Sequence, residues 1–100
     1  MDIVIYENKD IQNQLNIKKL DWELKDGKIH RIFQFKNFYD AFAFMTQVAI
    51  YAEKINHHPE WFNVYNKVIV ALITHDFGGG ISNFDIDLAA KMETFAKKYQ

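Results

Sequence analysis

Between Leu20 and Phe33 the chain reads LDWELKDGKIHRIF, in which apolar and polar residues alternate on the way into a central Asp26-Gly27 pair. Alternation with a period of two is typical of a half-buried β-strand, and Asp-Gly favours a two-residue type I′ turn. We therefore predict an antiparallel hairpin with its apolar side chains on one face. The register predicts three facing pairs: Leu24 with Ile29, Trp22 with Arg31, and Leu20 with Phe33.

Downstream of this hairpin the apolar residues take the spacing of a helix. From Phe38 onward they recur at three- and four-residue steps, which predicts a long amphipathic helix. Pro59 disfavours helical geometry at the residue before it, so we expect the helix to end near Asn56. The predicted buried face consists of Phe38, Ala41, Phe42, Met45, Val48, Ala49 and Ala52.

Two further strands are predicted after the proline, over residues 61–65 and 67–74, with a turn near Asn66. The second of them contains an unbroken apolar run from Val68 to Ile73. A strand that is apolar on both sides must be covered on both sides, whereas one layer of helices covers only one of them. We infer that a second subunit buries the other face of the sheet.

Helices are also predicted near both ends of the chain. A short polar helix covers about residues 8–15, and a final helix follows the Gly78-Gly79-Gly80 turn. Ser82 has the sequence signature of its N-cap, with Asp85 at the third helical position. We therefore predict one α+β domain over residues 1–100, a four-stranded antiparallel sheet with three helices on one face, in the order α-β-β-α-β-β-α.

Composition disfavours several classes of protein. The 100 residues carry a net charge of −1, with Lys and Arg scattered along the chain, so we expect no direct binding to nucleic acid. The absence of cysteine removes thiolate metal sites and cysteine nucleophiles. Neither a secretion signal nor an apolar run of membrane-spanning length is present, so we expect a cytoplasmic protein without membrane association.

Three of the four histidines, His57, His58 and His75, fall at the ends of predicted elements rather than within an apolar face. Element ends on a rigid scaffold commonly present reactive groups. Imidazole titrates near neutrality, so a cluster of the three could carry out acid and base steps together. The alternative is three surface histidines with no shared task, and spacing alone gives the two interpretations equal weight.

A metal site or an anion site is disfavoured. Adjacent histidines point apart in an extended chain and lie roughly 100° apart on a helix, so His57 and His58 seldom reach one ion. The glycine-rich turn at 78–80 could cradle an anion, but it lacks the lysine of a P-loop, and a hinge-like turn is the simpler interpretation. His30, opposite Glu23 in the hairpin, is assigned a structural or solvated role.

Two carboxylates and one tryptophan have both functional and structural interpretations. Glu53 precedes His57 by one helical turn and could orient its imidazole, although an exposed helix residue is the simpler interpretation. Asp85 is explained by the preference for an acid at the start of a helix. Trp61 could stack on a flat heterocycle, but aromatic residues in strands usually belong to the core.

The segment from Glu53 to Val68, EKINHHPEWFNVYNKV, resembles the pterin-4a-carbinolamine dehydratase family. The similarity continues through Thr74-His75, the glycine-rich turn and Asp85. It also extends upstream to the segment FQFKNF at residues 33–38, so that it covers roughly the last three quarters of the chain.

This resemblance implies dehydration of 4a-hydroxytetrahydrobiopterin to quinonoid dihydropterin, without a metal or an organic cofactor. The reaction recycles the product that aromatic amino acid hydroxylases leave. The implied catalytic residues are His57, His58 and His75, at least one as the acid toward the leaving hydroxyl and another to bind or orient the pterin. The implied substrate-binding residues are Glu53, Pro59, Trp61 and Asp85, with Glu53 stabilising the cationic character that develops on water loss.

The resemblance also implies assembly as a homodimer or homotetramer through the sheet and the helices, in agreement with the doubly apolar strand. Two other functions stay open. One is a non-enzymatic dimerisation or coactivator-type binding module, because animal members also act as dimerisation partners of a homeodomain transcription factor. The other is a pterin-binding protein linked to molybdopterin metabolism.

Overall fold

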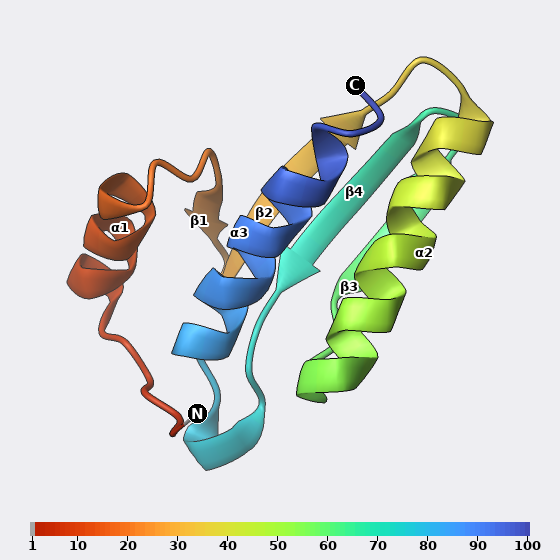
Figure 1. The fold of residues 1–100 in the computed structure, drawn as a ribbon. Coiled ribbons are helices and arrows are strands. Elements are labelled where there is room, and N and C mark those ends of the chain that lie inside the picture. The colour runs from red at the N-terminus through yellow and green to blue at the C-terminus, as the bar shows by residue number, and fades with distance from the viewer. Residues whose placement is uncertain (1) are drawn as a thin grey trace.

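The structure is a computed structural model that describes residues 2–100 and contains three α-helices and one four-stranded sheet (Figure 1). Its elements are α1 (Asn8–Ile17), β1 (Glu23–Lys25), β2 (Lys28–Gln34), α2 (Phe38–Ile55), β3 (Glu60–Val64), β4 (Lys67–Leu72), a short 3₁₀ helix η1 (Asp76–Gly78) and α3 (Asn83–Ala96). Neighbouring strands are antiparallel, in the order β1-β2-β4-β3. The predicted α+β architecture and its order of elements are confirmed.

The core lies between the helices and one face of the sheet. Figure 1 shows α2 and α3 in front of the strands, and these two helices also contact each other. Large side chains from both layers are fully buried, among them Phe33, Phe44, Val48, Val68, Leu72, Leu88 and Met92. Burying one side chain of this size contributes about 1.5–3 kcal/mol, so this apolar layer holds the helices on the sheet.

The hairpin forms around the predicted turn, but its first strand is shorter than predicted. The φ angles at the Asp26-Gly27 turn are both positive, 54° and 77°, as a type I′ turn requires. Leu24 faces Ile29, as predicted. Because β1 begins only at Glu23, the predicted extension of the strand back to Leu20 is wrong.

A residue of α3 binds the backbone just before β1, where the strand was predicted to continue. Glu93 of α3 accepts a hydrogen bond from the backbone N–H of Asp21 at 2.9 Å and forms an ion pair with Arg31 at 2.7 Å. The predicted pairing of Trp22 with Arg31 is therefore wrong. Instead, the Arg31 guanidinium lies 4.6 Å from the ring centroid of Phe33, and the buried Trp22 ring meets Phe33 edge-on.

The long helix has the predicted length but a different buried face. α2 ends at Ile55, and Asn56 caps it in the left-handed conformation with a φ of 54°. Three residues predicted to be buried, Phe38, Phe42 and Ala49, are exposed. At about 100° per residue, the buried stripe is rotated by roughly 50° from the predicted one. The residues that α2 buries are Ala41, Phe44, Val48 and Ala52.

The other face of the sheet carries an exposed apolar row. Ile32 of β2 faces Ile69 of β4, and Ile69 faces Phe62 of β3. Their exposed fractions are 60%, 38% and 63%. The centre of β4 is thus apolar on both sides, and a second subunit that covers this face stays a prediction.

The start of α3 follows the predicted capping pattern. Ser82 is the N-cap: its hydroxyl accepts a hydrogen bond from the backbone N–H of Phe84, and its own N–H donates to the Asp85 carboxylate. The preceding turn is closed by two backbone hydrogen bonds of 2.8 and 2.9 Å between Thr74 and Gly80. These two hydrogen bonds hold Thr74, two residues after the end of β4, close to the start of α3.

Candidate active site

The end of α2 and residues 73–75, which follow β4, meet at one edge of the sheet. Asn56 turns the chain out of the helix, so that the next two residues, His57 and His58, lead into β3. β3 and β4 are antiparallel, with Glu60 opposite Ala71, so the beginning of β3 lies beside the end of β4. His75 follows shortly after that end.

The three histidines line one shared cavity of about 210 Å³. Its other lining residues are Asn56, Ile73, Thr74 and Asp76. A second cavity, of about 220 Å³, lies against His57 as well and is bounded partly by Phe84 and Ile55. His57 and Thr74 line both cavities, so they form part of the wall between them.

His57 is the most enclosed of the three histidines, with 13% of its side chain exposed. Its Nε2 atom lies 2.6 Å from Oδ1 of Asp85, and its ring centroid is 5.8 Å from that of Phe84. When the imidazole is neutral, Nε2 must carry the hydrogen that the Asp85 oxygen accepts. Nδ1 of His57 then has a free lone pair.

Asp85 is held in place by the polypeptide around it. Its side chain is fully buried, and its second oxygen, Oδ2, accepts hydrogen bonds from the Thr74 hydroxyl at 2.7 Å and from the backbone N–H of Ser82 at 2.8 Å. A buried carboxylate needs such partners, because leaving it unpaired costs several kilocalories per mole. Asp85 therefore fixes the orientation of His57 from inside the protein.

The other two histidines are exposed and have glutamate neighbours. Nε2 of His58 lies 2.9 Å from Oε1 of Glu53, and Nε2 of His75 lies 3.7 Å from Oε2 of Glu60. The pKa of Glu60 lies below its ordinary value, chiefly because its carboxylate accepts a hydrogen bond from Lys28 at 2.6 Å. Each of the three imidazoles thus has a carboxylate next to Nε2, in surroundings that range from buried to exposed.

Glu53 and Asp85, two of the predicted substrate contacts, have partners or surroundings that were not expected. Glu53 contacts His58 rather than His57, because Asn56 ends the helix and removes His57 from the position one turn beyond Glu53. Asp85 has no exposed surface, and its contacts toward the cavities are with His57 and Thr74, which line them.

Pro59 and Trp61 are not among the described residues that line the histidine cavity. Pro59 is half-buried between His58 and the first residue of β3. Trp61 is half-buried and packs against the core, which is the structural interpretation that its strand position favoured. A substrate contact by either residue stays a prediction.

Two residues that were not predicted, Thr74 and Asp76, flank His75 and line both cavities. Thr74 follows an apolar strand and gives no spacing signal of its own. Asp76 opens η1 and resembles an ordinary turn residue. Only the pairing of Thr74 with Gly80 and the buried position of Asp85 reveal that the threonine hydroxyl faces the carboxylate.

The arrangement suits proton transfer. Each of the three imidazoles has one nitrogen beside a carboxylate oxygen, and an imidazole can donate a proton from one ring nitrogen and accept one at the other. Within residues 2–100, no three histidine, aspartate or glutamate side chains are grouped so that they could hold a metal ion. Over the same residues, no helix is both long and apolar enough to cross a bilayer.

Comparisons with known proteins agree on one family. The family described as pterin 4 alpha carbinolamine dehydratase matches residues 5–95. A protein of Prochlorococcus marinus (strain AS9601) whose name carries the term pterin-4-alpha-carbinolamine dehydratase is 50% identical over 92 residues, which cover 92% of this chain and 94% of that protein. A relative from Sinorhizobium medicae (strain WSM419) with the same term in its name is 58% identical over 78 residues, covering 76% and 73% of the two chains.

A solved structure has the same fold. The crystal structure described as transcriptional coactivator/pterin dehydratase from Brucella melitensis superposes with a TM-score of 0.85 at 45% identity. The match covers 93% of this chain and 99% of that one. The similarity thus includes the sheet, the helices and the stretch of chain that carries the three histidines.

Proposed function

Since this chain belongs to the pterin 4 alpha carbinolamine dehydratase family, we propose that it dehydrates 4a-hydroxytetrahydrobiopterin to quinonoid dihydropterin and water. The observation that carries the proposal is the shared cavity of His57, His58 and His75. Three imidazoles around one small cavity offer both an acid and a base to a bound ring system. The reaction serves the recycling of tetrahydrobiopterin.

The chemistry requires two proton transfers. The bond between carbon 4a and its hydroxyl oxygen breaks, the lone pair of nitrogen 5 forms the new double bond, and the oxygen leaves as water once an acid protonates it. A base removes the proton from nitrogen 5. General acid and base steps of this kind contribute about 10²–10⁴-fold each, and holding the substrate in place adds to that.

The surroundings of the three rings favour a division of roles. His57, whose Nε2 faces Asp85, has Nδ1 left to bind the pterin or to accept its proton. His58 and His75 are exposed at the cavity and can exchange protons with water, which suits the acid toward the hydroxyl. We assign to Glu53, whose carboxylate lies 2.9 Å from Nε2 of His58, the stabilisation of the cationic character that develops on water loss.

A direct assay tests the proposed reaction. Chemically prepared 4a-hydroxytetrahydropterin is mixed with the protein in a stopped-flow instrument, and formation of the quinonoid product is followed by absorbance. We expect the rate to rise in proportion to protein concentration above the spontaneous dehydration. A rate that does not depend on protein concentration would rule out the proposed activity.

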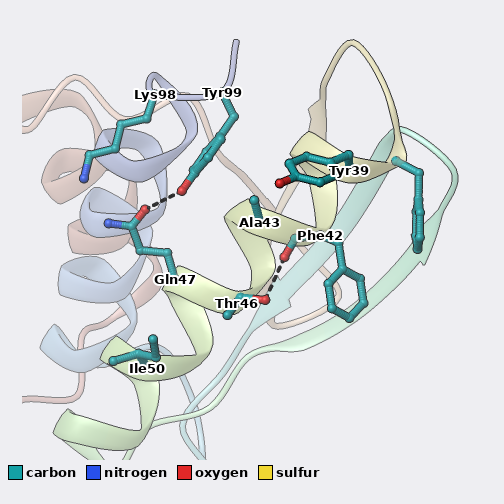
Figure 2. Close-up of a pocket in the computed structure, with 9 residues that line it drawn as sticks. Tyr39, Phe42, Ala43, Thr46, Gln47, Ile50, Lys98 and Tyr99 are labelled. Atoms are coloured by element: carbon teal, nitrogen blue, oxygen red, sulfur yellow. Dashed lines mark hydrogen bonds between the residues drawn. The ribbon is translucent and has the colours of Figure 1, made fainter.

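We also propose that the chain assembles as a homodimer or homotetramer. The exposed row on the sheet supports this proposal, and so does a groove of about 750 Å³ along the outer side of α2. Figure 2 shows Tyr39, Phe42 and Ile50 along this groove, with the Tyr99 hydroxyl donating to Gln47 at its edge. Exposed apolar surface of this kind is uncommon in a monomer.

A second candidate function is a dimerisation or coactivator-type binding module. The description of the Brucella melitensis relative includes the term transcriptional coactivator, and the apolar groove on α2 is a surface that such a module would need. A module of this kind would use α2 and not the histidines. We expect variants that lack His58 and His75 to lose dehydration and to keep the assembly that such a module needs.

A further inference from the structure

A continuous set of hydrogen bonds runs from His57 into the protein interior. Oδ1 of Asp85 faces Nε2 of His57, and Oδ2 of Asp85 accepts from the Thr74 hydroxyl. The Thr74 hydroxyl lies 2.6 Å from the Ser82 hydroxyl, where either oxygen could donate. Thr74, Ser82 and Asp85 are all buried, with exposed fractions of 3%, 0% and 0%.

The remaining contacts determine the direction of these hydrogen bonds. The Ser82 oxygen already accepts a hydrogen bond from the backbone N–H of Phe84 at 3.1 Å. If Ser82 donates to Thr74, then Thr74 can donate to Oδ2 of Asp85, and every buried hydroxyl has a partner. In the opposite direction Thr74 would donate to Ser82, and only the longer contact of 3.4 Å from the Ser82 hydroxyl would replace the threonine donor at Oδ2 of Asp85. The first direction is therefore the favoured one.

The backbone holds Thr74 in place independently of its side chain. Its N–H donates to the carbonyl of Gly80 at 2.8 Å, and its carbonyl accepts from the N–H of Gly80 at 2.9 Å. The next residue along the chain is His75, which lines the same cavity as His57. Thr74 thus precedes His75 directly and is linked to His57 through Asp85, while its backbone is held by Gly80.

We infer, on the basis of the proposed function, that Thr74 is a positioning residue for the reaction. Its hydroxyl holds Asp85 in the orientation that keeps hydrogen on Nε2 of His57 and leaves Nδ1 free to face the pterin. Without this donor Oδ2 of Asp85 keeps only its contacts with Ser82, the backbone N–H at 2.8 Å and the hydroxyl at 3.4 Å. The carboxylate is then held less tightly, and the preference of His57 for one tautomer weakens. Hydrogen-bonded partners behind an imidazole commonly control its tautomer in this way.

Four variants test this role. Thr74→Val replaces the hydroxyl by a methyl group of similar size, Thr74→Ala removes it without adding apolar bulk, and Thr74→Ser restores it. Thr94→Val is the matched control, because the Thr94 hydroxyl is exposed and bonds only to its own helix. Amide spectra of each variant establish that the fold is retained.

The first measurement is the tautomer of His57, from long-range proton–nitrogen correlation spectra of the imidazole. We expect the Nε2–H form in the wild type, in Thr74→Ser and in Thr94→Val, and a mixture of both tautomers in Thr74→Val and Thr74→Ala. The second measurement is dehydration kinetics. We expect kcat to fall about tenfold in the Val and Ala variants, as for the loss of one buried hydrogen bond, with KM changed less than about threefold.

A wild-type tautomer and a kcat within about twofold of wild type in both Thr74→Val and Thr74→Ala would overturn the inference. Failure of Thr74→Ser to restore the wild-type values would do the same. The spectra do not depend on turnover. A wild-type protein without dehydratase activity would thus refute the proposed function, and the tautomer would still test the role of Thr74.

Discussion

His57 and Asp85 are 28 positions apart in the sequence, and Nε2 of the histidine lies 2.6 Å from Oδ1 of the aspartate. The pair connects the turn after α2 to the first turn of α3. Asp85 therefore has two tasks: it completes the capping box with Ser82, and it orients an imidazole in the candidate active site. Stability of the helix start and geometry of the site depend on the same carboxylate.

We predict that Asp85→Asn lowers both stability and activity. An amide nitrogen would face either His57 or the donors on Thr74 and Ser82, so at least one buried donor loses its acceptor. We expect the free energy of unfolding to fall by about 1–3 kcal/mol and kcat to fall by at least ~10²-fold. Thermal unfolding and stopped-flow assays measure the two effects.

The exposed Asp21 provides the control for this substitution. We expect Asp21→Asn to leave kcat unchanged and to shift stability by less than about 0.5 kcal/mol. An Asp85→Asn protein with wild-type kcat would show that the orientation of His57 does not matter to the reaction.

Local patterns in the sequence predicted most of the architecture. The Asp26-Gly27 turn, the end of the long helix at Asn56 and the N-cap at Ser82 each depend on a few neighbouring residues, and all three are confirmed. The start of the hairpin was predicted wrongly because Glu93, 72 positions away, binds the backbone of Asp21. No local pattern contains that information.

The candidate site was predictable only in part, because some of its contacts join residues that are far apart in the sequence. Position at element ends singled out His57, His58 and His75, and the fold brings them to one cavity. The contact of His57 with Asp85 and that of Thr74 with Asp85 depend on how the start of α3 lies beside the residues that follow β4. The buried face of α2 was misjudged because an apolar residue adjacent to the stripe, such as Phe42, has the same hydropathy whether it is buried or exposed.

Stability at high pH should depend on Tyr51. Burial and a hydrogen bond to Asp87 of α3 raise the pKa of Tyr51 to about 12. The unfolded chain releases this proton near pH 10, so the folded state binds more protons above that pH. We expect the free energy of unfolding to have its full Tyr51 contribution below pH 10 and to lose it as the pH rises from about 10 to about 12.

Denaturant unfolding at a series of pH values measures this effect. Tyr51→Phe should weaken the decline between pH 10 and 12, whereas Tyr65→Phe should leave it unchanged, because Tyr65 is 61% exposed and lies outside the groove on α2. Identical slopes in the wild type and in Tyr51→Phe would contradict the prediction.

The ion pair between Lys28 and Glu60 should control the titration of that glutamate. The hydrogen bond from Lys28 is the first cause of the lowered pKa of Glu60, and His75 adds a smaller effect in the same direction. We expect Lys28→Met to raise the pKa of Glu60 toward its ordinary value, and Lys25→Met to leave it unchanged. Carbon-13 NMR titration of the carboxyl group measures both, and an unaltered pKa in Lys28→Met would exclude the pairing in solution.

If copies of the chain associate through the outer side of α2, a charge placed there should lower the mass of the sedimenting species. Phe42 is 54% exposed at the groove, so Phe42→Asp would place a charge into any apolar contact formed there. We expect the wild type to sediment as a dimer or tetramer and the variant as a smaller species. Ile17→Asp, at a residue that is 72% exposed on α1, is the control and should sediment as the wild type does. An unchanged mass in Phe42→Asp would exclude this surface as an interface.

The central claim is that histidine side chains carry out the proton transfers of pterin dehydration. The most direct measurement is the stopped-flow rate of 4a-hydroxytetrahydropterin dehydration by the wild type, by the double variant His58→Ala/His75→Ala and by His30→Ala. We predict a loss of at least ~10²-fold in the double variant with unchanged assembly, and no loss in His30→Ala, whose ring bonds the carbonyl of Lys25. Turnover by the double variant within about threefold of the wild type would contradict the claim.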